Sequence, residues 1–280
     1  MSPRGNPDWQ KGLMSFGDGR YSQGLEVGLA ILHAYSPERP VMGIADIADK
    51  LNMTRSTTHK YVVTLAALGL LEQVASRKYR LGARAADVGR SALDATGLND
   101  SALPYLADLR DRLGYTVSLA ILDDSAILYV ARVCSHRAGQ YDADMGRRRG
   151  SRVPASCTAM GKVLVAGLPP MDERKWTRAI KLNPVGPKAI VKKIVFRTEL
   201  ERVREQGFAV NNRELVSRMV AVAVPVHNGE VVSAAIGVAA NSKLISVSKL
   251  AVTCRDELLA TASEVAKHVD YNPQTRRRNT

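Results

Sequence analysis

Residues 54–60 have the types and spacing of side chains that read DNA. An arginine can bond guanine, while hydroxyl and lysine side chains mostly contact phosphate oxygens. In residues 54–68, the positions at helical spacing on one face are Thr58, Tyr61, Val62, Leu65 and Leu68. The other face then presents the residues that we predict to contact DNA, which are Thr54, Arg55, Ser56, Thr57, His59 and Lys60.

Residues 153–162 have the pattern of a site for an acidic small molecule. A strand end at Val153 is followed by small and hydroxyl residues, Ser156, Cys157 and Thr158, and then by a helix that begins near Ala159. Free backbone amides at such a helix start, aided by the helix dipole, can hold a carboxylate.

Two catalytic interpretations compete with this binding site. Cys157 at a helix N-terminus could be an activated thiolate, but no His with Asp or Asn suggests itself as its partner. Asp142 and Asp144 could pair as acid and base, although two carboxylates in a loop are usually only solvated. We therefore expect a protein that is not an enzyme.

The elements around residues 54–60 predict a winged helix-turn-helix. A first helix from Ser22 carries an apolar stripe, a second spans about 44–51, and Thr54 caps a third that runs to about Leu68. Strands at 70–73 and 79–81 then form a wing, and residues 75–78 form its turn. The stripe consists of Leu25, Leu29 and Leu32, with Val27 and Ile31 beside them. The basic residues that we place at the tip of the wing are Arg77, Lys78 and Arg80. The alternative is a small helical domain whose polar face is merely solvated.

The runs at 44–48 (IADIA), 54–57 (TRST), 68–71 (LGLL) and 79–82 (YRLG) resemble the winged-helix domain of IclR-type regulators, and the resemblance continues to about Asp270. It implies that a helix at 83–95 connects two domains and contributes to dimerisation. It also implies a GAF-like ligand-binding fold in which Ala159 and Met160 offer backbone amides to an acidic effector. Met145 and Val153 match apolar wall positions of that pocket.

The chain is thus expected to be an α+β protein, with an N-terminal winged helix-turn-helix, a linker helix and a C-terminal GAF-like effector domain. The pattern after residue 114 supports an effector domain of strands and helices. It consists of strand-like runs at 116–122 and 126–133, a capping box at 198–201 that opens a helix, a type I′ hairpin at Asn228-Gly229 and a final helix at about 248–268. We divide the chain into a disordered arm (1–20), a DNA-binding domain (21–82), a linker helix (83–100), an effector domain (101–270) and a basic tail (271–280).

The other wall of the predicted pocket departs from the pattern of family members that bind very small keto acids. Those members carry an acidic residue near Asn211 and Asn212, Cys at Val220, and serines at Gly237 and Ala239. A small polar ligand would leave its groups unpaired here, so we expect a larger aromatic carboxylate such as 4-hydroxybenzoate or protocatechuate. Its ring hydroxyl would bond one of four nearby side chains, Ser156, Thr158, Asn211 or Asn212. Residues 22–26 and 37–40 also resemble the subgroup that controls the catabolism of these two acids.

Composition limits the remaining possibilities. The net charge of +13 supports DNA binding only weakly, because residues 1–82 hold 10 Lys and Arg against 7 Asp and Glu and the rest of the chain holds 30 against 20. Three distant cysteines without a CxxC pair fit a reducing cytoplasm and predict neither disulfides nor zinc. No segment is typical of a signal peptide or membrane span, and nothing predicts a cofactor.

Three functions are compatible with parts of the sequence. The favoured one is a ligand-controlled transcription regulator that binds double-stranded DNA at a pseudo-palindromic operator as a homodimer or tetramer. The alternative is a small-molecule enzyme of hydrolase type with an accessory DNA-binding module. A nucleoid-type architectural protein would not explain the large second domain. The run Arg147-Arg148-Arg149 with Arg152 has three interpretations: a solvated surface, a contact to a second subunit or to DNA, or an attractor of anionic effectors.

Overall fold

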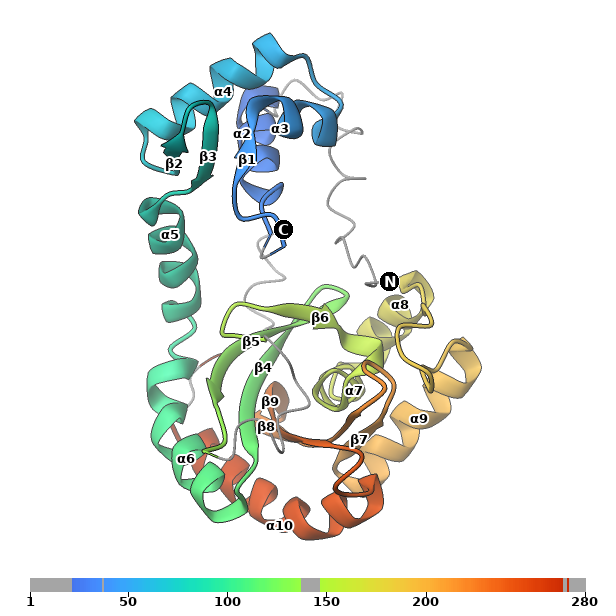
Figure 1. The fold of residues 1–280 in the computed structure, drawn as a ribbon. Helices are drawn as coiled ribbons and strands as arrows, with labels where there is room; N and C mark the ends of the chain where they lie inside the picture. The colour runs from blue at the N-terminus through green and yellow to red at the C-terminus, as the bar shows by residue number, and fades with distance from the viewer. Residues whose placement is uncertain (1–21, 37, 137–146, 269–270, 272–280) are drawn as a thin grey trace. The chain divides into compact units, whose positions relative to one another are not determined.

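The computed structural model describes residues 22–36, 38–136, 147–268 and 271. They form two compact units, Met1–Ala92 and Leu93–Thr280, each of which is described here by itself (Figure 1). The predicted N-terminal arm, residues 272–280 of the tail, and Asp142, Asp144 and Met145 lie outside the described residues.

The first unit is a winged helix-turn-helix, as predicted. The last helix in chain order is α5, and the three-stranded sheet has the order β1-β3-β2 (Figure 1). Asn52 adopts a left-handed conformation (φ 54°) that Asn tolerates better than most residues, which allows the tight turn between α3 and α4. In chain order the elements are α2 (Gln23–His33), β1 (Met42–Gly43), α3 (Ile44–Leu51), α4 (Arg55–Ala67), β2 (Leu71–Ala75), β3 (Lys78–Leu81) and α5 (Ala83–Asp94).

The apolar stripe predicted for α2 is wrong, because the helix buries a different face from the predicted one. Leu25 and Leu29 are exposed, whereas Ile31 and Ala30 are buried against the core of the unit. Small residues on the buried side let the helix approach its neighbours closely, so the smaller side chains and not the leucines mark the packed face. The core around Ile31 includes Ala34, Tyr35, Met42, Ile47, Val62, Leu65, Leu71 and Tyr79.

The second unit is built on a six-stranded antiparallel sheet with the order β6-β5-β4-β9-β8-β7. Helices α6 and α10 pack on one face, and α7 packs inside the curve of the other face with α9 beside it (Figure 1). The elements are α6 (Leu98–Leu113), β4 (Thr116–Asp123), β5 (Ala126–Val133), β6 (Arg152–Pro154), η1 (Ala155–Cys157), α7 (Ala159–Ala166), α8 (Pro170–Ala179), α9 (Lys193–Gln206), β7 (Ala209–Asn212), β8 (Met219–Asn228), β9 (Val231–Asn241) and α10 (Val247–Ala266).

Two local predictions in this unit are wrong. The helix predicted to begin at the Thr198 capping box begins at Lys193, and the Thr198 hydroxyl donates within it to the carbonyl of Ile194. Burial of Phe196 one turn before Leu200 explains the earlier start. The β8–β9 hairpin turns at Gly229 and Glu230, one residue later than predicted. Only Gly229 has a positive φ there, whereas a type I′ turn requires two.

The longest described helix, α10, has 20 residues. Neither it nor any other helix in the described part of the chain is long and apolar enough to cross a membrane.

Candidate functional site

Helix α4 presents the predicted DNA-contacting residues together. Thr54 caps it: its Oγ1 accepts a hydrogen bond from the Thr57 amide at 3.2 Å. Thr58 is fully buried, so the helix is fixed with the opposite face outward. The exposed residues there are Thr54, Arg55, Ser56, Thr57, His59 and Lys60, as the sequence predicted.

The wing places only part of its basic set at the tip. Arg77 lies in the turn with φ 56°, and Lys78 begins β3. Arg80 lies farther along β3, where its guanidinium makes two hydrogen bonds of 3.0 and 3.1 Å with Glu72 on β2. The prediction that all three basic residues lie at the tip is therefore wrong for Arg80, which lies within β3 and is paired with a carboxylate.

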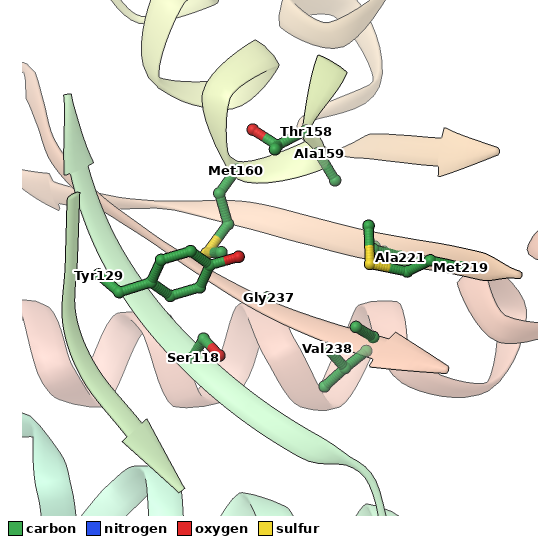
Figure 2. Close-up of a pocket in the computed structure, with 11 residues that line it drawn as sticks. Ser118, Tyr129, Thr158, Ala159, Met160, Met219, Ala221, Gly237 and Val238 are labelled. Carbon is green, nitrogen blue, oxygen red and sulfur yellow. The ribbon is translucent and has the colours of Figure 1, made fainter. Parts of the chain in front are cut away.

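A pocket of about 360 Å³, part of it open to solvent, lies between the N-terminus of α7 and the sheet (Figure 2). Of the predicted effector residues, it brings together Thr158, Ala159, Met160, Gly237 and Ala239. The remaining lining residues are Ser118, Tyr129, Met219, Ala221, Val222 and Val238.

The start of α7 is held against η1 by close packing and by a cap. A Cβ on Gly161 would lie 2.1 Å from the carbonyl oxygen of Ala155, so only glycine fits. Thr158 Oγ1 accepts from the Gly161 amide at 3.0 Å. The amides of Ala159 and Met160, the first two of the helix, have no intrahelical acceptor, and no other described residue accepts from them. They lie at the pocket, where an acidic group can be bound.

Strand parity corrects two predicted pocket residues. Side chains alternate between the faces of a strand, and those on β8 that face α7 are Met219, Ala221 and Ala223. Val220 points to the other face and packs in the cluster with α6 and α10. Asn212 pairs with Val220 across β7 and β8 and therefore shares its side of the sheet. Val220 and Asn212 are thus not pocket residues.

Four further predicted residues lie near α7 without lining the pocket. Asn211 is fully buried: its Nδ2 donates to the carbonyl of Cys157, and its Oδ1 accepts from the Glu214 amide at 3.3 Å. Val153, Ser156 and Cys157 are buried in β6 and η1. These residues support the packing of α7 and do not form the pocket wall.

Gly237 lies at the pocket but leaves no room for a side chain. A Cβ there would lie 2.9 Å from the carbonyl oxygen of Val222 and 3.1 Å from Met160 Cγ. The glycine allows β9, β8 and α7 to approach one another, so a large residue at this position would disturb the sheet itself. Gly237 therefore offers no empty space that a larger side chain could fill without moving its neighbours.

Ser118 on β4 and Tyr129 on β5, which we did not predict from the sequence, are both buried and line the pocket (Figure 2). Each is a hydroxyl residue within a strongly apolar strand, and this pattern could have indicated a site. A buried polar group is costly unless it has a hydrogen-bond partner. Their approach to α7 depends on sheet pairing between distant segments, which no local pattern reveals.

Cys157 has the wrong environment for a nucleophile. Its thiol is buried, and burial, with the nearby Glu214 carboxylate, raises its pKa to about 12. The thiol donates weakly to the carbonyl of Pro154 at 3.5 Å. Within the described residues, no three His, Cys, Asp or Glu side chains are grouped so as to hold a metal ion.

Two of the arginines near β6 have structural partners. Arg149 donates to the carbonyl of Val130 at 3.1 Å and forms an ion pair of 2.5 Å with Asp94. Arg152 pairs with Asp123 at 2.6 Å. These contacts favour a structural role for both over a freely solvated surface.

An exposed helix of a helix-turn-helix beside a basic wing, joined in one chain to a sheet domain with a small pocket, defines a DNA-binding protein of the winged-helix class with a second domain. The model of the IclR helix-turn-helix domain matches residues 24–75, and that of the bacterial transcriptional regulator IclR C-terminal domain matches residues 90–270. The chain belongs to the IclR family of bacterial transcriptional regulators.

Relatives of the chain include regulators of aromatic catabolism. The chain is 28% identical over 221 residues to the Pca regulon regulatory protein of Pseudomonas putida, covering 78% of this chain and 74% of the relative. It is 28% identical over 213 residues to the p-hydroxybenzoate hydroxylase transcriptional activator of Acinetobacter baylyi, covering 75% and 78%. A crystallised IclR homologue from Microbacterium hydrocarbonoxydans, complexed with 4-hydroxybenzoate, shares the fold with a TM-score of 0.74 and 22% identity, covering 87% and 99%.

Proposed function

We propose that an aromatic carboxylate such as 4-hydroxybenzoate or protocatechuate binds the α7 pocket and controls the binding of this regulator to its operator. The observation that carries the proposal is the pair of unpaired amides, of Ala159 and Met160, at a pocket with largely apolar walls. The amides would bond the carboxylate, and the side chains of Met160 and Met219 would cover the ring.

The relatives support the aromatic class. Two of them are named for the Pca regulon and for p-hydroxybenzoate hydroxylase, and the Microbacterium homologue was crystallised with 4-hydroxybenzoate. The β8 and β9 walls support the same class, because Gly237, Ala239 and Ala221 offer no polar side chain there to a very small keto acid, and the hydroxyl side chains at the pocket belong to other elements.

Calorimetry with benzoate, 4-hydroxybenzoate and protocatechuate tests the proposal, with glyoxylate and pyruvate as controls. Fluorescence anisotropy with an operator fragment should show a changed affinity at saturating acid. The acid recovered afterwards should be unchanged, because the pKa of the Cys157 thiol is raised and Cys157 does not line the pocket. Tight binding of the keto acids and none of the aromatic acids would refute the aromatic class.

For DNA, we propose that α4 enters the major groove with Arg55, His59 and Lys60 toward the bases, while Thr54, Ser56 and Thr57 contact phosphates. Arg77 and Lys78 of the wing would lie against the backbone. The exposed positions of these side chains support the assignment.

We further propose a homo-oligomer with two-fold symmetry on a pseudo-palindromic site, since one winged helix buries little surface for specific affinity. Two features support it: α5 buries none of its 12 residues within the chain, and Val88 on α5 and Leu25 on α2 are 66% and 65% exposed. Light scattering and footprinting test it, and a monomer with a single half-site footprint would refute it.

A further inference from the structure

Ser118, which lines the pocket, lies opposite Arg132 on the neighbouring strand. They are register partners on β4 and β5, so both side chains extend to the same face of the sheet. Arg132 Nη1 donates a hydrogen bond of 3.3 Å to Ser118 Oγ, and Ser118 is only 4% exposed. Figure 2 shows Ser118 and Tyr129 on the strand wall and Ala159 and Met160 on the helix wall opposite.

The hydrogen bond from Arg132 fixes what Ser118 can offer a ligand. The serine oxygen accepts from the guanidinium, so the hydroxyl proton remains to be donated. No acceptor for that proton is found among the described residues. The arginine charge strengthens the donor and disfavours a ligand that brings its own cation.

We infer that Ser118, positioned by Arg132, is a second polar anchor of the pocket, which selects acids that carry a second oxygen acceptor away from the carboxylate. The Tyr129 hydroxyl, on the adjacent strand and also at the pocket, contributes to the same anchor. The inference rests on the proposed binding of an organic acid at α7 and specifies its chemistry: a carboxylate on one wall, and a phenolic, carbonyl or carboxylate oxygen on the other. Ser118 would thus take the part that we expected one of Ser156, Thr158, Asn211 and Asn212 to play.

Paired acids that differ only in the second oxygen test this anchor. The pairs are benzoate with 4-hydroxybenzoate and butyrate with succinate, and their dissociation constants would be measured by calorimetry on the full chain. The variants are Ser118→Ala, Ser118→Thr, which keeps the hydroxyl, and Arg132→Met. Ser233→Ala is the matched control, because Ser233 is also a buried serine of the sheet but donates to the carbonyl of Val226.

The wild type should prefer the acid with the second oxygen by about five- to tenfold, the worth of one hydrogen bond. Ser118→Ala and Arg132→Met should bring that ratio near one while the dissociation constant of the plain acid stays within about twofold. Ser118→Thr and Ser233→Ala should keep the preference. If Arg132 had only a structural role, its replacement would weaken the binding of both acids of a pair alike. The ratio of the two dissociation constants therefore distinguishes a structural role from the proposed positioning of Ser118. If Arg132→Met does not fold, Ser118→Ala alone decides.

The outcomes separate this inference from the proposed function. Binding of aromatic acids without a preference, or a preference retained in Ser118→Ala, overturns the anchor and leaves the aromatic proposal standing. A preference seen only for succinate over butyrate, and lost in Ser118→Ala, supports the anchor but refutes the aromatic class. Binding of none of the four acids refutes both.

Discussion

Lys162 on α7 donates a hydrogen bond of 2.7 Å to Oε1 of Glu214, and both side chains are buried. The same ammonium donates to the carbonyl of Val210 at 3.0 Å and to Glu199 on α9 at 3.2 Å, so all three of its protons are used. Glu214 Oε1 in turn accepts from the Asn212 amide. This ion cluster ties α7 to β7 and α9 and so fixes the helix whose first amides lie at the pocket.

Replacing Lys162 should therefore destabilise the second unit strongly. Lys162→Met leaves the Glu214 carboxylate buried without its cation, and we expect the free energy of unfolding to fall by about 3–5 kcal/mol. Urea unfolding followed by Trp176 fluorescence measures this change. Lys267→Met removes an exposed lysine paired with Glu264 and should cost at most about 1 kcal/mol. The double variant with Glu214→Gln should recover part of the loss. Equal stabilities of Lys162→Met and Lys267→Met would contradict the role of the cluster.

The three cysteines should react very differently. Burial raises the pKa values of Cys157 and Cys254 to about 12, while Cys134 is exposed. At pH 8, iodoacetamide should modify Cys134 in the folded protein and the other two only after unfolding, as mass spectrometry would show. If Cys157 reacted as fast as Cys134, the hydrolase alternative would have to be reconsidered.

The same shifts predict how stability depends on alkaline pH. A folded pKa raised above the ordinary value of 9.0 contributes stability below pH 9, and this contribution is lost as the pH rises from 9 toward 12. Cys157→Ala should therefore make the decline of the unfolding free energy above pH 9 shallower than in the wild type. An unchanged slope would show that the thiol does not carry this dependence.

The winged helix was predictable because its signals are local. Thr54 as a cap, Asn52 in the tight turn and glycine after α4 each define an element end from neighbouring residues alone. The orientation of α2 was not predictable from local signals, because packing against α3 and α4 decides it. Leucines on its outer side therefore resembled a core stripe.

The pocket was predictable only in part, and the reason is strand parity. Residues 219–226 are almost all small and apolar, and both faces of β8 are covered by helices. Such a strand shows no polar and apolar alternation, so nothing in it separates Val220 from Ala221. Ser118 and Tyr129 come to the α7 pocket only through pairings between distant strands.

The recognition helix and the wing should respond differently to mutation. Arg55→Ala should lower the affinity for the operator by about 1–3 kcal/mol, because a lost base contact acts on specific binding only. Arg77→Ala should weaken specific and nonspecific DNA alike and reduce the slope of log affinity against log salt by about one. Anisotropy titrations at several salt concentrations measure both. Arg80→Ala is the control, because Glu72 already pairs that cation, and it should change the slope less.

Filling the pocket from Ala239 should abolish acid binding without unfolding the sheet. Ala239 lines the pocket and is only half-buried, whereas the backbone and Met160 crowd Gly237. Ala239→Leu should therefore remove the calorimetric signal of 4-hydroxybenzoate while operator binding without acid persists. Met160→Ala should weaken the acid through lost apolar contact, about 25 cal/mol per Å² uncovered. Met171→Ala on the exposed side of α8 should do nothing. If Ala239→Leu still bound the acid with wild-type affinity, the ligand would have to lie elsewhere, since a leucine side chain and a benzene ring cannot share so small a space.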